Sequence, residues 1–148
     1  MSNIISELVL VWDMRISARC RYALQAVLEM SKVPAGTVLK VSDIAARPRI
    51  PADYLVQVLI LLKTAGIVES VRGKQGGYRL AKPAGRITVG EVVEAVGGRS
   101  QAVEGLSASF VEVLRRAEEA AKSILEGTSF EDLVRTELEA RTAVSYSI

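Results

Sequence analysis

The chain has 148 residues, contains no histidine, and has Cys20 as its single cysteine. A chain of this length forms one ordinary domain with a sizeable core. A single cysteine excludes an intrachain disulfide and any cluster held by several thiolates of one chain, and the lack of histidine excludes imidazole catalysis and the commonest zinc or haem ligand. No apolar run reaches the roughly 18 to 20 residues of a membrane span, and no signal peptide is evident, so we expect a cytoplasmic protein with no membrane partner.

The net charge of +2 conceals a separation of charge along the sequence. Residues 14–86 hold thirteen Lys and Arg against four Asp and Glu, a net charge of +9, whereas residues 87–148 hold six against eleven, a net charge of −5. A basic half beside an acidic half suggests that an anionic partner binds the basic half. Nucleic acid is the usual partner of this kind.

Apolar residues at helical spacing predict three helices in the first half of the chain. These helices cover residues 17–31, 43–47 and 51–65. Ser42 is the expected N-cap of the second, Pro51 suits the first position of the third, and Gly66 suits a left-handed cap after it. Two short helices joined by a tight turn predict a helix-turn-helix.

A hairpin is predicted directly after these helices, over residues 67–82. Its loop contains glycines at 73, 76 and 77, which permit positive backbone angles and close approach to another molecule. Arg72, Lys74 and Arg79 supply positive charge around the loop. A helix-turn-helix followed by such a hairpin is typical of a winged helix that contacts DNA, and a hairpin with a solvated tip is the alternative.

Three further helices are predicted from capping boxes, in which a Ser or Thr is followed three residues later by Glu. The capping pairs are Thr88 with Glu91, Ser109 with Glu112, and Thr128 with Glu131. Gly97 and Gly127 are expected to end the first two helices. The predicted organisation is an N-terminal extension (1–13), a winged domain (14–97), a linker (98–108), dimerisation helices (109–141) and a polar tail (142–148).

The helix that begins near residue 109 carries a narrow apolar stripe of near-heptad spacing, called the seam below. The seam consists of Phe110, Val113, Leu114, Ala117, Ala121, Ile124 and Leu125. Charged residues occupy the other faces, so the seam requires a second helix. We expect self-association as a homodimer, because paired half-sites on DNA need two-fold symmetry; packing of the seam against its own domain is the alternative.

Several segments resemble the IscR-type family of winged-helix transcription regulators over about residues 14 to 134. The segments are Met14-Arg-Ile-Ser-Ala-Arg-Cys-Arg-Tyr-Ala-Leu24, Tyr54-Leu-Val-Gln57, Gly66-Ile-Val-Glu-Ser-Val-Arg-Gly-Lys-Gln-Gly-Gly-Tyr78, residues 87–96 and Thr128-Ser-Phe-Glu-Asp-Leu133. The resemblance implies a mainly α fold with a small β-hairpin, a winged helix-turn-helix domain and a long C-terminal dimerisation helix. It also implies a homodimeric regulator of transcription that binds double-stranded DNA at imperfect palindromes.

The resemblance assigns DNA-binding roles position by position. It implies backbone contacts and packing by the N-terminal segment, base contacts by the recognition helix and minor-groove entry by the wing. The matching residues are Ser17, Arg19, Arg21 and Tyr22; Tyr54 and Gln57; and Arg72, Gly73, Gly76 and Gly77. Independently, charge favours phosphate contacts by Arg15, Arg19, Arg21, Lys63 and Lys74. Gln57 can pair with adenine in the major groove, and Arg72 can enter a narrow A·T-rich minor groove. Tyr54 as a core aromatic and Gln57 as a solvated polar residue are the alternatives.

The sequence also departs from the family. Many members hold an iron-sulfur cluster through three cysteines between the fourth helix and the dimerisation helix, but residues 98–109 contain none. We therefore expect no cofactor and no metal; replacement of native cysteines by Ala or Ser is the alternative. Cys20 lies on an apolar stripe and is expected to be a buried, inert thiol; a redox sensor activated by the neighbouring arginines is the alternative. Residues 1–13 precede Met14, where the family usually starts, and a misassigned start is the plain explanation.

We expect a transcriptional repressor without a catalytic site. The rival hypothesis is a protein-interaction module whose apolar recognition face, formed by Val56 and Ile60, binds a partner enzyme instead of DNA. The net charge of the winged domain argues against this rival. An effector protein or small molecule is a further candidate partner that the sequence does not identify.

Overall fold

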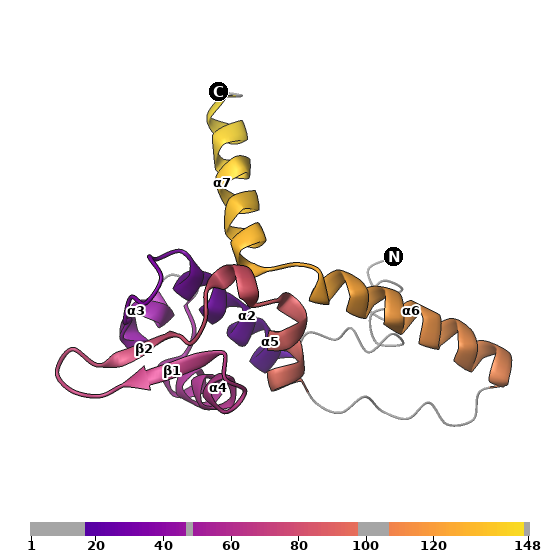
Figure 1. Ribbon diagram of the computed structural model, residues 1–148, viewed down its shortest axis with the longest axis horizontal. Helices are drawn as coiled ribbons and strands as arrows, with labels where there is room; N and C mark the ends of the chain where they lie inside the picture. Colours follow the sequence, from indigo (N-terminus) through magenta and orange to yellow (C-terminus); the bar gives the residue numbers. More distant parts are fainter. Residues whose placement is uncertain (1–16, 47–48, 98–106, 147–148) are drawn as a thin grey trace.

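The computed structural model describes residues 17–46, 49–97 and 107–146 (Figure 1). Its elements are α2 (Ala18–Ser31), α3 (Val41–Ala46), α4 (Ala52–Thr64), β1 (Val68–Val71), β2 (Gly77–Leu80), the 3₁₀ helix η1 (Ala84–Arg86), α5 (Val89–Val96), α6 (Ala108–Glu126) and α7 (Phe130–Tyr146). The predicted mainly α fold with one hairpin is confirmed. Predictions for residues 1–13, for Arg15 and for most of the linker lie outside the described residues.

The core lies between α2, α4 and α5, and α2 packs against both of the others. Its largest fully buried side chains come from every element of the winged domain except β2 and η1, together with the first turn of α7. They are Val27, Ile44, Leu55, Val58, Leu59, Leu62, Val68, Ile87, Val92, Val96 and Phe130. Leu55, Val58, Leu59 and Leu62 form the buried face of α4. The opposite face of α4 is thereby turned away from the core.

Local hydrogen bonds define the start of α2 and the end of α4. The Ser17 hydroxyl accepts a bond of 3.1 Å from the Cys20 backbone N–H and caps α2. After α4, Gly66 has φ +76°, as predicted, and the Gly66 and Ile67 N–H groups donate to the Lys63 and Leu62 carbonyls. Pro51 is the N-cap of α4 and not its first residue. These ends fix the length of the exposed face of α4.

The hairpin pairs β1 with β2 in antiparallel register, with Val71 opposite Gly77. Its outer edge is extended by Leu39, whose backbone exchanges two hydrogen bonds of 2.8 Å with Tyr78. A side chain at Gly77 would overlap the Leu39 carbonyl, because the carbonyl carbon would lie 2.8 Å from its Cβ. The connection between α2 and α3 therefore holds the hairpin in place through backbone contact.

The N-caps predicted for α3 and α6 differ from the structure. The α3 helix begins at Val41 and includes Ser42, and the Asp43 carboxylate accepts the Lys40 N–H at 3.2 Å. The α6 helix begins after Ser107, so Ser109 lies inside it, and Ser107 itself makes no side-chain cap bond. Both predicted caps were therefore one or two residues too late in the chain.

The last helix also begins later than predicted. Its capping box is formed by Ser129 and Asp132, where Asp132 accepts the Ser129 N–H and the Ser129 hydroxyl accepts the Asp132 N–H, both at 3.1 Å. The backbone bond to Ser129 is the main reason why the pKa of Asp132 is lowered. The predicted pair of Thr128 and Glu131 was therefore wrong. The helix continues to Tyr146, through most of the segment predicted as a polar tail.

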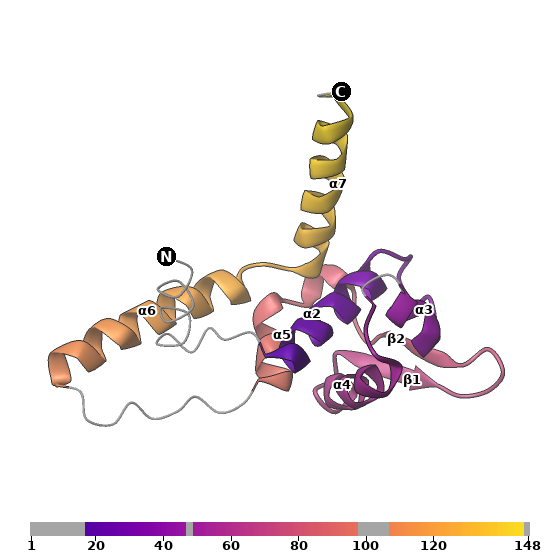
Figure 2. The same cartoon turned by 180° about the vertical axis from the view of Figure 1, so that it is seen from behind.

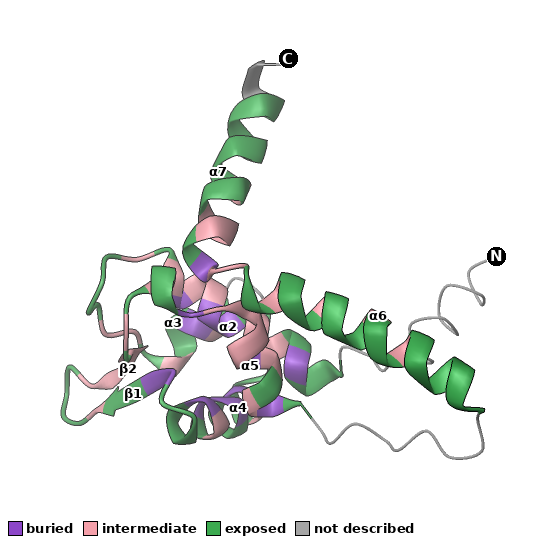
Figure 3. Ribbon diagram, turned by 45° about the vertical axis from the view of Figure 1, so that its right-hand side comes forward, coloured by how far each residue is buried: buried purple, intermediate pink, exposed green. Residues whose placement is uncertain are grey.

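The α6 and α7 helices project from the winged domain in different directions (Figure 1, with the reverse view in Figure 2). Within the described chain, α6 buries none of its side chains completely, and Figure 3 shows it mostly exposed, with intermediate positions at intervals. The half-buried seam residues are Leu114, Ala117, Ala121 and Leu125, and Leu125 helps to line an apolar groove beside Leu24 and Leu28 of α2. Packing of the whole seam against its own domain is therefore not what the structure shows.

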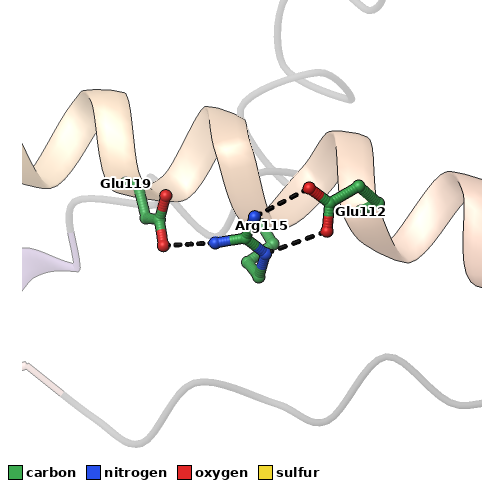
Figure 4. A network of polar contacts seen from close by, with 3 residues as sticks. All are labelled: Glu112, Arg115 and Glu119. Carbon is green, nitrogen blue, oxygen red and sulfur yellow. Dashed lines mark hydrogen bonds and ion pairs between the residues drawn. The ribbon is translucent and has the colours of Figure 1, made fainter.

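The side of α6 away from the seam is organised by Arg115 (Figure 4). Its guanidinium donates to both oxygens of Glu112, at 2.7 and 3.0 Å, and to Glu119 one turn on. The bonds to Arg115 lower the pKa of Glu112, and the two carboxylates raise the pKa of Arg115. Because all three side chains are exposed, this network contributes little to stability. It lies on the face of α6 that contacts solvent.

Candidate nucleic-acid interface

The exposed face of α4 carries Gln57 and two apolar side chains, Val56 and Ile60. Lys63 is exposed one turn further on, in the last turn of the helix. Gln57 therefore lies on the surface, as hydrogen bonding of its amide to adenine requires. Leu61, the next residue after Ile60, packs against the core.

The start of α2 lies beside the start of α4. The Tyr22 and Tyr54 rings meet edge to face, with centroids 5.2 Å apart, and the Arg21 guanidinium lies 5.2 Å from the Tyr22 ring centre. Tyr54 is half-buried and contacts the core, so the interpretation of Tyr54 as a packing aromatic is favoured. The contact brings the exposed Arg19 and Arg21 close to the first turn of α4.

The hairpin loop presents exposed Arg72, Gly73 and Lys74 at the end of the domain away from α6 (Figure 1). Gly73 has φ +106°, a conformation that glycine adopts without strain, and its carbonyl accepts the Gly76 N–H at 3.0 Å. Gly76 lies so close to the Val71 carbonyl that a larger residue would not fit. The glycines thus shape a narrow loop with two cations at its tip.

Some basic side chains of the winged domain are paired with carboxylates and others are not. Lys32 is paired with Glu29 and Glu137, Arg79 with Glu69 and Lys82 with Glu91. Within the described residues no carboxylate pairs with the cations predicted to contact DNA, which are Arg19, Arg21, Lys63, Arg72 and Lys74. Arg79 differs from Arg72 and Lys74, because it forms an ion pair of 2.8 Å with Glu69 on the opposite strand of the hairpin.

Three further findings concern predicted site residues. The Ser17 hydroxyl is engaged in capping α2, and Arg15 lies outside the described residues. Arg49, exposed in the turn between α3 and α4 with φ +49°, is an additional cation that the sequence analysis did not select. An arginine in a turn directly before a recognition helix was the available signal.

Cys20 is buried on α2, as predicted. Burial raises the pKa of its thiol, and the nearby Arg19 charge only partly opposes this effect. The thiolate is therefore disfavoured, which fits an inert core residue. In the described parts of the chain, no group of three potential metal-ligating side chains comes together, and no helix there is long and apolar enough to cross a membrane.

A helix-turn-helix with an exposed polar and apolar face, followed by a hairpin with a cationic tip, defines a winged helix-turn-helix DNA-binding domain. Residues 16–136 match the Rrf2 family, described as an iron-dependent transcriptional regulator. The chain belongs to the Rrf2 family.

Two relatives similar in sequence support the assignment to this family. An HTH-type transcriptional regulator of Mycobacterium tuberculosis (strain ATCC 25618 / H37Rv) is 33% identical over 130 residues, 81% of each chain. The regulator IscR of Cronobacter sakazakii is 42% identical over 83 residues, which are 56% of this chain and 51% of that protein.

Solved structures extend the likeness to most of the chain. The structure of CymR, the global cysteine regulator of B. subtilis, has a TM-score of 0.74 at 30% identity and covers 82% of this chain and 97% of CymR. The structure of T. potens IscR has a TM-score of 0.75 at 26% identity and covers 85% and 90%. The chain is accordingly a DNA-binding transcriptional regulator and not an enzyme.

Proposed function

We propose that the protein acts as a homodimer that represses transcription by binding imperfect palindromes in promoter DNA. In this arrangement α4 of each protomer enters a major groove and Arg72 of each wing enters the flanking minor groove. The observation that carries the proposal is the set of exposed cations on α2, α4 and the wing that have no carboxylate partner, whereas Lys32, Arg79 and Lys82 of the same domain are paired. Repression by occupying a promoter site requires no contact surface other than the one that binds DNA.

The dimer is proposed from α6. Its seam exposes Phe110, Val113 and Ile124 by more than half of their surface, whereas charged residues cover the opposite side. Large apolar side chains aligned along a helix that projects from its domain are stabilised by a second helix. A two-fold pair of α6 helices would bury the seam and place two α4 helices for paired half-sites.

Regulation is proposed to proceed without an iron-sulfur cluster of the protein's own. Residues 98–109 contain no cysteine, and the only thiol of the chain is buried in the α2 core. A cysteine-ligated cluster requires several accessible thiolates. We therefore infer control by an effector protein or a small molecule.

The proposal is tested by in-vitro selection of genomic DNA fragments with the purified, metal-free protein at near-physiological salt. We expect enrichment of an A·T-flanked palindrome whose half-sites are spaced by about one helical turn or a multiple of it. Absence of enrichment would contradict DNA binding by the protein alone and favour the rival in which α4 binds a partner protein.

Replacing Arg72 by Ala is expected to weaken specific binding by about 1 to 3 kcal/mol. The change removes an exposed guanidinium that has no carboxylate partner and is proposed to enter the minor groove. Fluorescence anisotropy with the selected site and with a scrambled duplex measures this loss. Binding to the scrambled duplex should change much less, since Arg72 is proposed to sense groove shape.

Two variants of the same hairpin provide controls. Arg79→Ala removes a cation already paired with Glu69 and should leave the affinity within about threefold. Lys74→Ala removes a proposed phosphate contact and should reduce the salt slope by about 0.9. An Arg72→Ala protein that binds as well as the wild type would refute the minor-groove assignment.

A further inference from the structure

Two large apolar side chains are exposed on the face of α4 that the fold leaves free. Val56 is 38% exposed and Ile60 is 53% exposed, and Gln57 is exposed beside them. Ile60 lies four residues after Val56 and three after Gln57, so its side chain neighbours both on the helix surface and joins the three into one patch. The rest of the turn faces the core through Leu55, Val58 and Leu59.

The chemistry of this patch matches one base pair. In the major groove, only thymine presents a methyl group, and apolar side chains are its natural contacts. Only adenine presents the donor and acceptor pair that a glutamine amide can satisfy with two hydrogen bonds. Neither Val56 nor Ile60 can satisfy the polar edge of a G·C pair, which would lose hydrogen bonds to water against an apolar side chain.

We propose that Val56 and Ile60 are specificity-determining residues that contact thymine 5-methyl groups next to the adenine bound by Gln57. The centre of each half-site is therefore A·T-rich for reasons separate from the wings. This inference rests on the proposed placement of α4 in the major groove. Val56 lies within the first two turns of α4, where recognition helices approach base edges most closely, so its contact should be the stronger of the two.

The position of the patch favours DNA over a partner protein as its occupant. Its surroundings carry the unpaired Arg19, Arg21 and Lys63, and the wing adds Arg72 and Lys74. A protein surface that covered the patch would also have to neutralise these cations, whereas the phosphates beside a major groove do so directly. Binding of a partner protein is retained as an outcome of the experiment.

The experiment replaces thymine by uracil, one position at a time, in the duplex obtained by selection. Uracil keeps every base-pairing group and lacks only the 5-methyl group. At one or two half-site positions, each replacement should weaken binding of the wild-type protein roughly fourfold, which corresponds to one buried methyl group. Uracil outside the half-sites should have no effect.

A cycle with Val56→Ala assigns the contact. This variant should be insensitive, within about 1.5-fold, to uracil at the position where the wild type is most sensitive, and Ile60→Ala should be insensitive at a neighbouring position. Val111→Ala, which alters a valine of similar exposure (42%) on α6, should keep the full uracil effect. Because Val56 is exposed and alanine favours helices, the variant should fold normally.

Each outcome separates this inference from the proposed function. Specific binding that is unaffected by uracil at every half-site thymine would overturn the methyl contact and leave DNA binding intact. A uracil effect that persists in both the Val56→Ala and Ile60→Ala proteins would assign the contact to other residues and overturn the inference. No specific retention of DNA by the wild type would overturn both.

Discussion

Replacing Ile124 by Glu is expected to convert the proposed dimer into a monomer and to reduce affinity for the proposed palindromic site by at least about a hundredfold. Ile124 is 69% exposed on the seam of α6, so the change leaves the fold of the protomer intact. In the dimer the same carboxylate would be buried against an apolar partner helix, where an unpaired charge is strongly disfavoured. The loss of affinity follows because two linked half-site contacts exceed one by about 10² to 10⁴.

Light scattering and anisotropy test this expectation together. The variant should have the mass of one 16.0 kDa chain, and its affinity for a single half-site should match that of the wild type. Ser123→Glu supplies the matched control, because it adds the same charge one residue earlier on the opposite side of the helix. A dimeric Ile124→Glu protein with unchanged affinity would show that the seam is not the interface.

Features set by a few neighbouring residues were predictable from the sequence. The capping box of Thr88 and Glu91 is present, with bonds of 3.1 and 3.2 Å, because both partners lie within one helical turn. Gly66 takes the left-handed conformation for an equally local reason. Such elements depend little on what packs around them.

The wrongly predicted start of α7 shows where a prediction from neighbouring residues fails. Thr128 has a suitable glutamate three residues later, but its carbonyl accepts the Val89 N–H and its hydroxyl donates to the Ile124 carbonyl, both at 2.9 Å. Ser129 pairs with Thr88, and Phe130 donates to the Ile87 carbonyl. This contact with a segment forty residues earlier keeps Thr128 extended, so the helix can begin only at Phe130. A pairing between distant segments leaves no periodic signal in the sequence.

The candidate site was predictable to a similar degree. Exposure of Gln57, Arg72 and Lys74 followed from helical spacing and from the glycine-rich loop. The pairing of Arg79 with Glu69 depends on strand register, which the sequence analysis did not specify. The edge-to-face contact of Tyr22 and Tyr54 depends on how α2 packs on α4, which no local pattern encodes.

Replacing Gly77 by Ala is expected to destabilise the protein by about 2 kcal/mol and to weaken specific DNA binding tenfold or more. The new Cβ would overlap the Leu39 carbonyl oxygen and come 3.2 Å from the Lys40 Cα, and neither backbone group can rotate away. Relief requires separation of Leu39 from Tyr78 and loss of the two hydrogen bonds that join them, each of which contributes about 0.5 to 1.5 kcal/mol. The wing would then lose its fixed orientation toward the minor groove.

Chemical denaturation and anisotropy measure the two effects, with Gly85→Ala as the matched control. The Cβ at Gly85 would meet only the carboxylate of Glu131, the far end of an exposed side chain that can turn aside. That variant should therefore keep its stability and its affinity. If Gly77→Ala lowered stability but left specific affinity unchanged, the wing would not need the Leu39 contact for its orientation, because the hairpin register and the turn at Gly73 would suffice to place Arg72 on DNA.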